Sequence, residues 1–425
     1  MKILIQNGRV LDPSCNRDEV TDVLIEEGVI RKVGKQERPK EDGDIRCIDA
    51  TGCYVMPGLV DLHVHFRDPG LTYKEDIETG CAAAANGGFT SVFAMPNTKP
   101  VADEPSVIRY VQEKAKPTGV HVYQVGSVTK GMQGKELSDL GGMFEAGCKA
   151  ISEDGKSVMD SGIYREAMEI AAAHNIPVFA HCEDINLVRG GVMNLDERSK
   201  ALGLKGISNA VEDVIVARDI LLAKETGARL HLCHCSTKDS VEMVRQAKAE
   251  GLPISGEVCP HHFTLSSEDI PADDGNYKMN PPLRTREDVE ALKKGLQMDI
   301  MDVISTDHAP HSAEEKNGSM SKTAFGIVGL ETSVALTITE LVRTGIISPM
   351  QMAAKMSTNP ARIAGIPGGS LKEGSVADVT VIDPEASYEI DPEQFLSKGH
   401  NTPFAGRKVY GKVMYTISEG RIIKE

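Results

Sequence analysis

The chain has 425 residues, and 62 acidic against 47 basic residues give it a formal net charge of −15. This balance argues against broad binding to nucleic acid or to anionic lipid, because both require a basic surface. No segment has the apolar length of a membrane span or of a signal peptide, and the nine cysteines are scattered, so we expect a cytoplasmic protein with mostly reduced cysteines.

Both ends of the chain carry a β-rich pattern. Near the N-terminus, strand character covers residues 2–10, 22–34 and 45–56, with turns expected at Asn7-Gly8, Glu27-Gly28 and Thr51-Gly52. Near the C-terminus it covers residues 376–383 and 407–424, with turns expected at Tyr410-Gly411 and Glu419-Gly420. Because the two β-rich ends flank one body, we predict a small β-sandwich domain formed by residues 1–56 plus 366–425.

Between the ends, apolar β-rich runs alternate with helical patterns. Eight candidate strands cover residues 60–65, 91–96, 121–127, 148–152, 177–181, 230–234, 254–258 and 302–306. The clearest helix is 210–226, with Asn209 as its expected N-cap, Glu212 three residues later and Gly227 just past the end. This pattern predicts an α/β fold, a (β/α)8 TIM barrel over residues 57–365, for which roughly 250 residues suffice. A doubly wound open sheet is the alternative, although no G-x-G-x-x-G motif follows the first strand.

Side chains that bind metals gather where the predicted strands end, and a barrel of this kind places its chemistry at those ends. The first strand ends in His63 and His65, and residues two apart on a strand share a face. Alone this pair is a weak signal, because either His could be a packed or surface residue. Four further strand ends supply Asp154, His181, His234 and Asp307. Five strands that bring His or Asp to one rim therefore predict a metal centre.

The six candidate ligands are four imidazoles and two carboxylates, which exceeds what one ion needs. A catalytic zinc site takes three protein ligands plus water. We therefore predict two zinc ions per chain with Asp154 as the bridging ligand, although nitrogen and oxygen ligands could also hold cobalt or manganese. Two divalent ions would leave residual positive charge, which favours an anionic substrate and stabilises a developing oxyanion.

The other histidines and two cysteines near the ligands are interpreted more simply. We take His121, His174, His231 and His400 as structural, whereas His261, His262 and His308 could support the ligands or lie in loops. Cys233 and Cys235 flank His234 and on a regular strand would share the opposite face. We expect both cysteines to pack outward against helices rather than to bind a soft metal.

Several motifs together resemble the amidohydrolase superfamily and, within it, the bacterial class I dihydroorotases. They are PGLVDLHVH at 57–65, FRDPG at 66–70, MPNT at 95–98, AHCE at 180–183, YKMNPPLR at 277–284, TDHAPH at 306–311, FGIVG at 325–329 and NTPF at 401–404. The resemblance runs along essentially the whole chain. No single motif is specific, but the combination is.

The resemblance implies a role for each candidate site residue. The first zinc would be held by His63, His65 and Asp307, the second by His181 and His234, with Asp154 as the bridge. The substrate would be bound by His65, its carboxylate by Arg67, Asn97 and His311, and its ring by Asn280 and the backbone near Phe325 and Gly326. Hydantoinases usually bridge their metals with a carbamylated Lys, but Lys149 begins the fourth strand and is expected to lie too deep for that role.

The resemblance also implies a reaction, the reversible cyclisation of N-carbamoyl-L-aspartate to L-dihydroorotate in pyrimidine (UMP) synthesis. A zinc-bridging hydroxide would attack the ring amide, with Asp307 as general acid and base. The alternatives are a hydantoinase or allantoinase, and a non-catalytic scaffold partner of aspartate transcarbamoylase; bound zinc would separate an enzyme from a scaffold. A homodimer and an association with aspartate transcarbamoylase stay open.

Two local expectations concern the rim of the barrel. An extended backbone would keep Arg67 on the side of the ligands, unless Arg67 pairs structurally with Asp68 or Glu75. Residues 312–324 are polar and lack helical or strand periodicity. We therefore expect a mobile active-site loop rather than a buried element, with an ordinary surface connection as the alternative.

Overall fold

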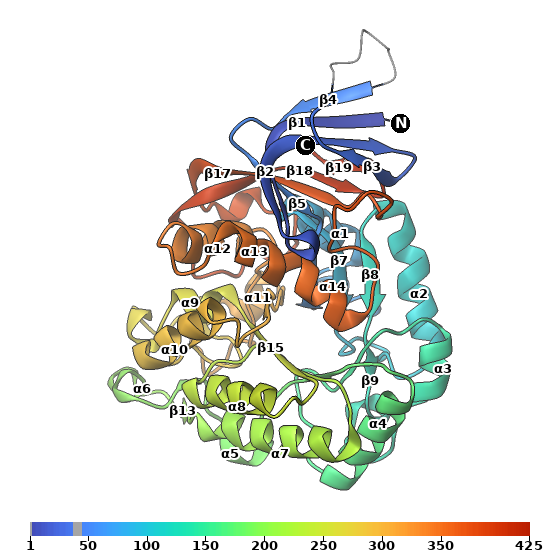
Figure 1. Cartoon of the computed structure of the whole chain (residues 1–425). Helices are drawn as coiled ribbons and strands as arrows, with labels where there is room; N and C mark the ends of the chain where they lie inside the picture. The colour runs from blue at the N-terminus through green and yellow to red at the C-terminus, as the bar shows by residue number, and fades with distance from the viewer. Residues whose placement is uncertain (1, 37–44) are drawn as a thin grey trace.

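Both ends of the chain contribute to one mixed sheet in the computed structural model, which describes residues 2–36 and 45–425 and leaves residues 1 and 37–44 of the predicted terminal domain outside the described residues. The strand order is β19-β18-β17-β5-β1-β2-β3, with β4 paired to β1. The N-terminal strands are β1 (Lys2–Asp12), β2 (Arg17–Glu26), β3 (Val29–Val33), β4 (Ile45–Asp49) and β5 (Tyr54–Pro57). The C-terminal strands are β17 (Val379–Glu389), β18 (Lys408–Ser418) and β19 (Arg421–Lys424). Blue and red strands therefore lie together at the top of Figure 1.

The two halves of this sheet meet where β5 pairs with β17. The pairing is antiparallel and joins 54–57 to 379–382. Apolar side chains from both halves, including Ile3, Val23 and Ile417, form one buried core. The expected β domain built from both termini is confirmed, whereas its boundaries at 56/57 and 365/366 stay a prediction.

Two of the expected turns are irregularities inside strands instead. β1 continues through Asn7, whose φ of 63° accompanies a register shift against β2. β18 continues through Gly411, whose φ of 97° lies at a register break against β17. A left-handed residue serves a bulge as well as a hairpin, so the sequence pattern did not separate the two. The turns expected at Glu27-Gly28, Thr51-Gly52 and Glu419-Gly420 are present.

The middle of the chain forms a closed ring of parallel strands in the predicted order. These are β6 (Leu59–Val64), β7 (Phe89–Ala94), β8 (His121–Gln124) continued by β9 (Gly126–Ser127), β10 (Ile151–Ser152), β11 (Val178–Ala180), β14 (Leu230–Leu232), β15 (Ile254–Val258) and β16 (Val303–Ile304). A parallel bridge between Val64 and His308 closes the ring. The predicted barrel is confirmed, and its strand ends meet at one rim.

Most helices lie around the outside of the ring (Figure 1). The helices of the chain are α1 (Ile77–Asn86), α2 (Pro105–Ala115), α3 (Leu140–Glu145), α4 (Ser161–Ala173), α5 (Ile185–Val188), α6 (Glu197–Leu202), α7 (Ala210–Thr226), α8 (Lys238–Ala249), α9 (Pro260–Thr264), α10 (Arg286–Gln297), α11 (Ala313–Lys316), α12 (Ser333–Thr337), α13 (Pro349–Ala353) and α14 (Asn359–Ala364). Between α5 and α7, β12 (Met193–Asn194) and β13 (Gly206–Ile207) form a separate ribbon.

Helix α7 has the predicted bounds but not the predicted N-terminal cap. Gly227 ends it in the left-handed conformation, as expected. Asn209 makes no side-chain cap and instead donates to Asp288, 3.1 Å away. Glu212 accepts hydrogen bonds from the backbone and hydroxyl of Ser236, in the connection after β14. Tertiary partners therefore replace the local capping box.

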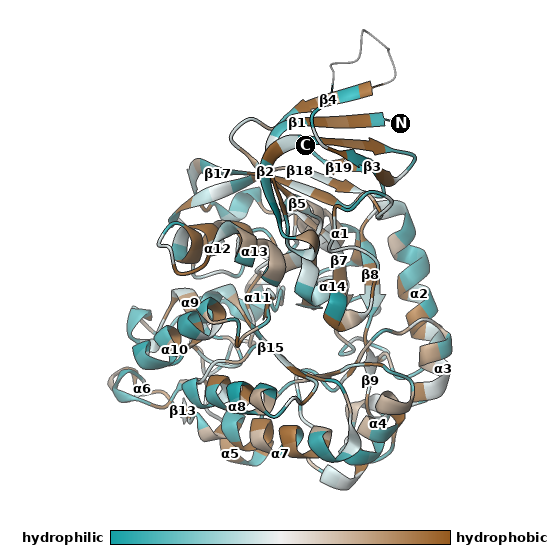
Figure 2. Ribbon diagram, viewed as in Figure 1, coloured by the Kyte–Doolittle hydropathy of each residue, from teal (hydrophilic) through white to brown (hydrophobic). Residues whose placement is uncertain are grey.

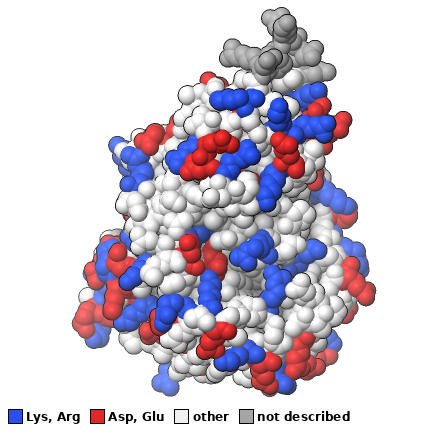
Figure 3. Space-filling view, in the orientation of Figure 1, with Lys and Arg blue, Asp and Glu red and all other residues white. Residues whose placement is uncertain are grey.

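Apolar side chains fill the inside of the ring and the layer between strands and helices. The interior includes Val60, Leu62, Phe93 and Phe179, all buried. In Figure 2 the strands of the terminal sheet are largely brown, whereas α2 and α10 carry long teal stretches. Acidic and basic side chains are interspersed on the face drawn in Figure 3. Within 2–36 and 45–425, no helix combines the length and apolar character needed to cross a membrane.

Candidate metal centre

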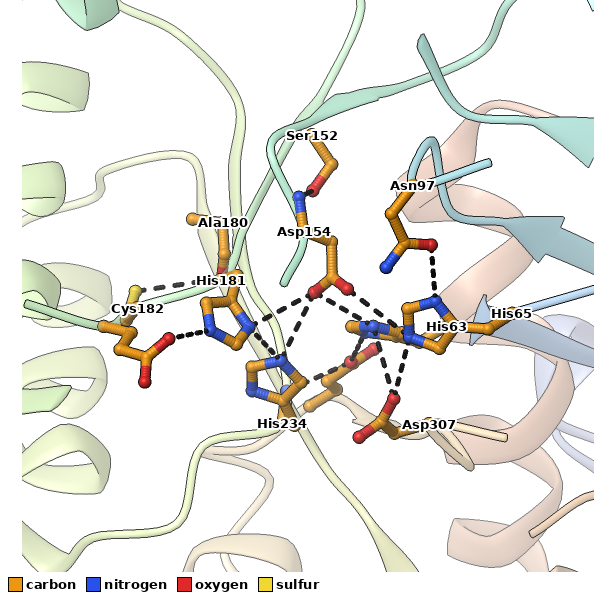
Figure 4. A network of polar contacts seen from close by, with 12 residues as sticks. His63, His65, Asn97, Ser152, Asp154, Ala180, His181, Cys182, His234 and Asp307 are labelled. Atoms are coloured by element: carbon orange, nitrogen blue, oxygen red, sulfur yellow. Dashed lines mark hydrogen bonds and ion pairs between the residues drawn. The ribbon is translucent and has the colours of Figure 1, made fainter. Parts of the chain in front are cut away.

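His63, in β6, and His65, directly after it, both face the carboxylate of Asp154, which follows β10 (Figure 4). His63 Nε2 lies 3.1 Å from Asp154 Oδ1, and His65 Nε2 lies 3.4 Å from Asp154 Oδ2. The two-residue spacing places both rings on one side of the strand, as expected. Three predicted ligands thus converge from two barrel strands.

His181 and His234 approach the same carboxylate from the other side in Figure 4. His181 Nδ1 lies 3.3 Å and His234 Nε2 lies 3.5 Å from Asp154 Oδ1. The second ring nitrogen of His181 is 3.0 Å from Glu183 Oε2, which fixes the ring with Nδ1 toward the cluster. A carboxylate behind an imidazole orients it as a metal ligand.

Asp307 follows β16 and lies beside the first pair of histidines. Its Oδ1 is 3.2 Å from His65 Nε2 and 3.6 Å from His63 Nε2. Asp154 therefore occupies the middle of the cluster, between His63, His65 and Asp307 on one side and His181 and His234 on the other. All six predicted ligands come together at the carboxyl ends of the barrel strands.

The donor atoms of this cluster fit divalent metal ions. Two converging sets share Asp154, one completed by His63 and His65 and the other by His181 and His234. His63 Nε2 and Asp154 Oδ1 are buried and make no hydrogen bond. Such unpaired buried atoms are rare in proteins, and metal coordination would use both lone pairs. These residues could therefore hold metal.

The charges of the cluster keep its two carboxylates in the ionised form that binds metal. Burial alone would raise the pKa of Asp154, but the facing imidazoles of His63, His181 and His234 hold that pKa well below its usual range. Burial also opposes ionisation of Asp307, yet the hydrogen bond from His65 lowers its pKa below the usual value. Both carboxylates are therefore ionised near neutral pH, as metal ligands must be.

Glu257, in β15, supports the cluster and was missed by the sequence analysis. It is fully buried, with Oε1 3.0 Å from His63 Nδ1 and Oε2 3.0 Å from His231 Nε2. His231, which we had interpreted as merely structural, thus braces the carboxylate that orients His63. A charged residue inside an apolar barrel strand was the available signal, because buried charges are normally paired.

Substitution of Glu257 by Gln is expected to weaken metal binding about 10- to 100-fold, because the partner that orients His63 loses its charge. Equilibrium dialysis against a metal-buffered solution measures this affinity. Glu268→Gln, which changes an exposed carboxylate after the same strand, is the matched control and should bind metal like the unmodified protein. Equal affinity in the Glu257→Gln and control variants would show that Glu257 does not support the centre.

The expectation for Cys233 is wrong, whereas that for Cys235 holds. Cys233 belongs to the buried apolar cluster inside the barrel, which also contains Val60 and Phe179, while Cys235 belongs to the outer cluster. Strand β14 ends at Leu232, and His234 has a φ of 33°. Alternation of faces holds only along extended backbone, so the two cysteines do not share a face.

Arg67 lies beside the cluster, although not on extended backbone. Its φ is 60°, in the left-handed region, so the strand geometry that we expected there is wrong. The side chain is 8% exposed, and its Nε donates to Pro310 O at 3.3 Å. Asp68 pairs with Lys114 instead, and Glu75 binds His308. Within the described chain, no ion pair joins Arg67 to a carboxylate, so the structural alternative fails.

Asn97 contacts the ligand His65, and His311 contacts Arg67. Asn97 Oδ1 is 2.9 Å from His65 Nδ1, which leaves the amide nitrogen of Asn97 facing the cluster in Figure 4. His311 Nε2 is 3.4 Å from Arg67 Nη2 and 2.8 Å from Phe325 O. Burial and the charges of Arg67 and Lys74 lower the pKa of His311 to about 3, so His311 is neutral at physiological pH.

The other predicted substrate contacts lie in two neighbouring connections. The backbone N–H of Gly326 donates to Lys278 O at 3.0 Å, which joins the segment after β16 to the segment that contains Asn280. A side-chain hydrogen bond from Asn280 helps to lower the pKa of Glu183, whose other partner is His181. The structure thus brings Asn280, Phe325 and Gly326 to the same rim, and their contact with substrate stays a prediction.

The remaining histidines and Lys149 lie outside the six-residue ligand cluster, as most of them were expected to. His121 and Lys149 line a pocket with Arg421, away from the cluster. Lys149 lines this pocket rather than the cluster, in agreement with its expected depth. His174 is on the surface, and His400 is exposed.

His308 pairs with Glu75, and His262 lies 2.9 Å from Pro281 O. Buried His261 and His262 pack against each other with ring centroids 4.2 Å apart.

Residues 312–324 are more structured than their sequence pattern indicates. Ser312 and Glu315 form a capping box that begins the helical turn α11. Lys316 and Met320 are buried, at 5% and 0% exposure. Most of the segment is exposed or half-buried, as expected for a loop, but the helical turn and the buried side chains of Lys316 and Met320 were not expected. Four residues are too few to show periodicity, and a buried Lys has no apolar signature. Movement of this segment stays a prediction.

The chain is similar to dihydroorotases along its whole length. A family model described as "Dihydro-orotase-like" matches residues 52–240. Dihydroorotases of Pelotomaculum thermopropionicum and Geobacter metallireducens are each 48% identical, over 100% of this chain and 99% of theirs.

The fold is also found in hydantoinases. The L-hydantoinase (dihydropyrimidinase) of Arthrobacter aurescens is 26% identical with a TM-score of 0.89, over 100% of this chain and 96% of that one. A D-hydantoinase from Bacillus sp. AR9 is 25% identical with a TM-score of 0.84, over 99% and 95%. With full-length relatives at 48% identity, the chain belongs to the dihydroorotase family.

Proposed function

We propose that this chain is a metal-dependent dihydroorotase, which interconverts N-carbamoyl-L-aspartate and L-dihydroorotate in pyrimidine synthesis. Membership of the family gives the reaction class. The observation that carries the proposal is Arg67, a buried guanidinium without a carboxylate partner in the described chain, next to six ligand-type side chains. A buried charge needs a partner, and the substrate carboxylate would supply one.

Two zinc ions per chain are the metals that we propose. His63, His65 and Asp307 would hold one ion, His181 and His234 the other, and Asp154 both. Nitrogen and oxygen donors suit zinc, while cobalt and manganese have overlapping preferences. When bound, such ions polarise an amide carbonyl and lower the pKa of a water molecule to about 7.

Asp307 is the proposed general acid and base. In ring opening it would accept the proton of the attacking water and deliver it to the leaving ring nitrogen; in ring closure the proton moves the opposite way. Its lowered pKa keeps it ionised before the reaction. The 3.2 Å contact between its Oδ1 and His65 Nε2 fixes the carboxylate at the rim. Asp307 can thus move one proton between two substrate positions.

Two groups of residues near the metal ligands would hold the substrate, one at its carboxylate and the other at its ring. Arg67 can grip a carboxylate with a planar pair of N–H donors, and Asn97 can donate its amide hydrogens to the same group. The 3.4 Å contact of His311 with Arg67 places a neutral imidazole next to that grip. Asn280 and the backbone near Phe325 and Gly326 would contact the ring.

Parallel assays with dihydroorotate, hydantoin and allantoin test the proposed substrate. Because neutral rings leave Arg67 without a partner, turnover of dihydroorotate should exceed that of both neutral rings by at least about 10²-fold, the lower end of the effect expected when a buried charge loses its partner. Faster turnover of hydantoin or allantoin would favour the hydantoinase or allantoinase alternative. Protein that binds no zinc and turns over none of the three would favour the scaffold.

Assembly stays a prediction from the sequence. A homodimer and an association with aspartate transcarbamoylase are both proposals, as is a cytoplasmic location. Analytical ultracentrifugation of the chain alone, and then with purified aspartate transcarbamoylase, would measure both associations. A monomer boundary for the chain alone, and separate boundaries for the two proteins in the mixture, would reject them.

A further inference from the structure

Lys316 has a buried amino group that the proposed reaction does not use. It ends the helical turn α11, and only 5% of it is exposed. Its ammonium donates to three backbone carbonyls, those of Lys278 at 3.0 Å, Ala324 at 3.0 Å and Gly326 at 2.8 Å. Within the part of the chain that the structure describes, no ion pair joins Lys316 to a carboxylate. Three neutral acceptors therefore use all three N–H donors of the ammonium.

These three carbonyls belong to two connections of the barrel rim. Lys278 lies in the segment after β15, two residues before Asn280. Ala324 and Gly326 flank Phe325 in the segment after β16. The carbonyl oxygen of Phe325 is 2.8 Å from His311 Nε2. The ammonium therefore ties together the two segments that carry the proposed ring contacts.

The two segments that Lys316 links are closely packed, so neither can move far without a clash. A Cβ added to Gly275, on the β15 side, would lie 2.3 Å from the carbonyl oxygen of Lys316. A Cβ on Gly326 would lie 2.6 Å from the Cβ of Ala309. The side chain of Asn401 also donates to Gly326 O at 3.0 Å and to Ala309 O at 3.1 Å. The backbone at Gly326 is thus held by hydrogen bonds from Lys316 and Asn401 and by close packing against Ala309.

We propose that Lys316 is a positioning residue for substrate, which holds the Phe325–Gly326 backbone and the Asn280 segment at the spacing that the substrate ring requires. This inference rests on the proposed dihydroorotase function. Lys316 has no contact with the six proposed metal ligands among its hydrogen bonds. Its loss should therefore affect substrate binding much more than metal binding or proton transfer.

Lys316→Met tests the role, because it keeps the length of the side chain and removes all three donors. The metal-loaded full chain should show a KM for dihydroorotate at least about 10-fold higher, kcat within about 3-fold, and an unchanged metal content. Lys322→Met removes a charge from an exposed position of the same segment and is the matched control. It should behave like the unmodified chain.

Other results would overturn the inference. A KM within 2-fold of the unmodified chain, or a fall in active fraction and melting temperature with KM unchanged, would leave Lys316 only a structural role. Should Lys316→Met fail to fold, Lys316→Gln, which keeps two N–H donors, is measured in the same way. It is expected to raise KM by a smaller factor, and an unchanged KM would overturn the proposal. Absence of dihydroorotase activity in the unmodified chain would instead reject the proposed function.

Discussion

Arg67→Met should reduce kcat/KM for dihydroorotate by roughly 3–5 kcal/mol of transition-state stabilisation, about 10²- to 10⁴-fold in rate. The reason is that a buried substrate carboxylate would lose its charged partner. Arg67 is buried, burial lowers its pKa only to about 10, and it is therefore fully charged at neutral pH. Steady-state kinetics in both directions, with metal content measured on the same samples, give the effect.

The effect of Arg67→Met should differ between substrates with and without a carboxylate. Neutral cyclic amides, already poor substrates, should be affected far less, and metal content should stay normal because Arg67 is not a proposed ligand. Arg109→Met, on the exposed face of α2, removes the same charge at a distance and should change none of these quantities. Turnover of dihydroorotate within a few-fold of the unmodified chain would disprove the carboxylate assignment.

Asp154→Ala should remove bound metal and nearly all activity. Asp154 lies between the two groups of histidines, with contacts of 3.1–3.5 Å to His63, His65, His181 and His234. Without this shared carboxylate each half of the centre loses a ligand, and two cations close together lose a negative charge between them. Elemental analysis of protein purified without chelator should give fewer than two ions per chain.

The control for Asp154→Ala is a substitution of an acidic residue outside the metal-ligand cluster. Glu145→Ala changes an exposed carboxylate in α3, just before β10, and should keep metal content and kcat. Loss of metal in both variants would point to a general defect in folding. Retention of both ions with full activity in Asp154→Ala would remove Asp154 from the bridge.

The fold and the ligand cluster were predictable because both depend on short-range patterns. Strand ends in a barrel meet at one rim, so His63, His181, His234 and Asp307 could be grouped without knowledge of the distances between them. Glu183, in the AHCE motif, was quoted from the sequence, but its 3.0 Å contact with His181 was not anticipated. The direction of its side chain depends on the turn after β11.

Features that depend on distant partners were not predictable. Glu257 supports His63 across the barrel, Glu212 binds Ser236 instead of capping α7, and Lys316 binds carbonyls from two connections. In each case a polar side chain finds its partner through tertiary structure. Backbone geometry also intervened, because positive φ angles at Arg67 and His234 ended the alternation on which the sequence argument relied.

We propose that the cluster around Asp154 is a two-metal centre that opens the dihydroorotate ring and closes N-carbamoyl-L-aspartate. Metal-free protein, prepared with a chelator that is then removed, should be inactive and should regain dihydroorotase activity as zinc is added. Activity should rise until two equivalents of zinc are bound per chain and then stay constant. Full activity without metal, or saturation at one equivalent, would contradict this proposal.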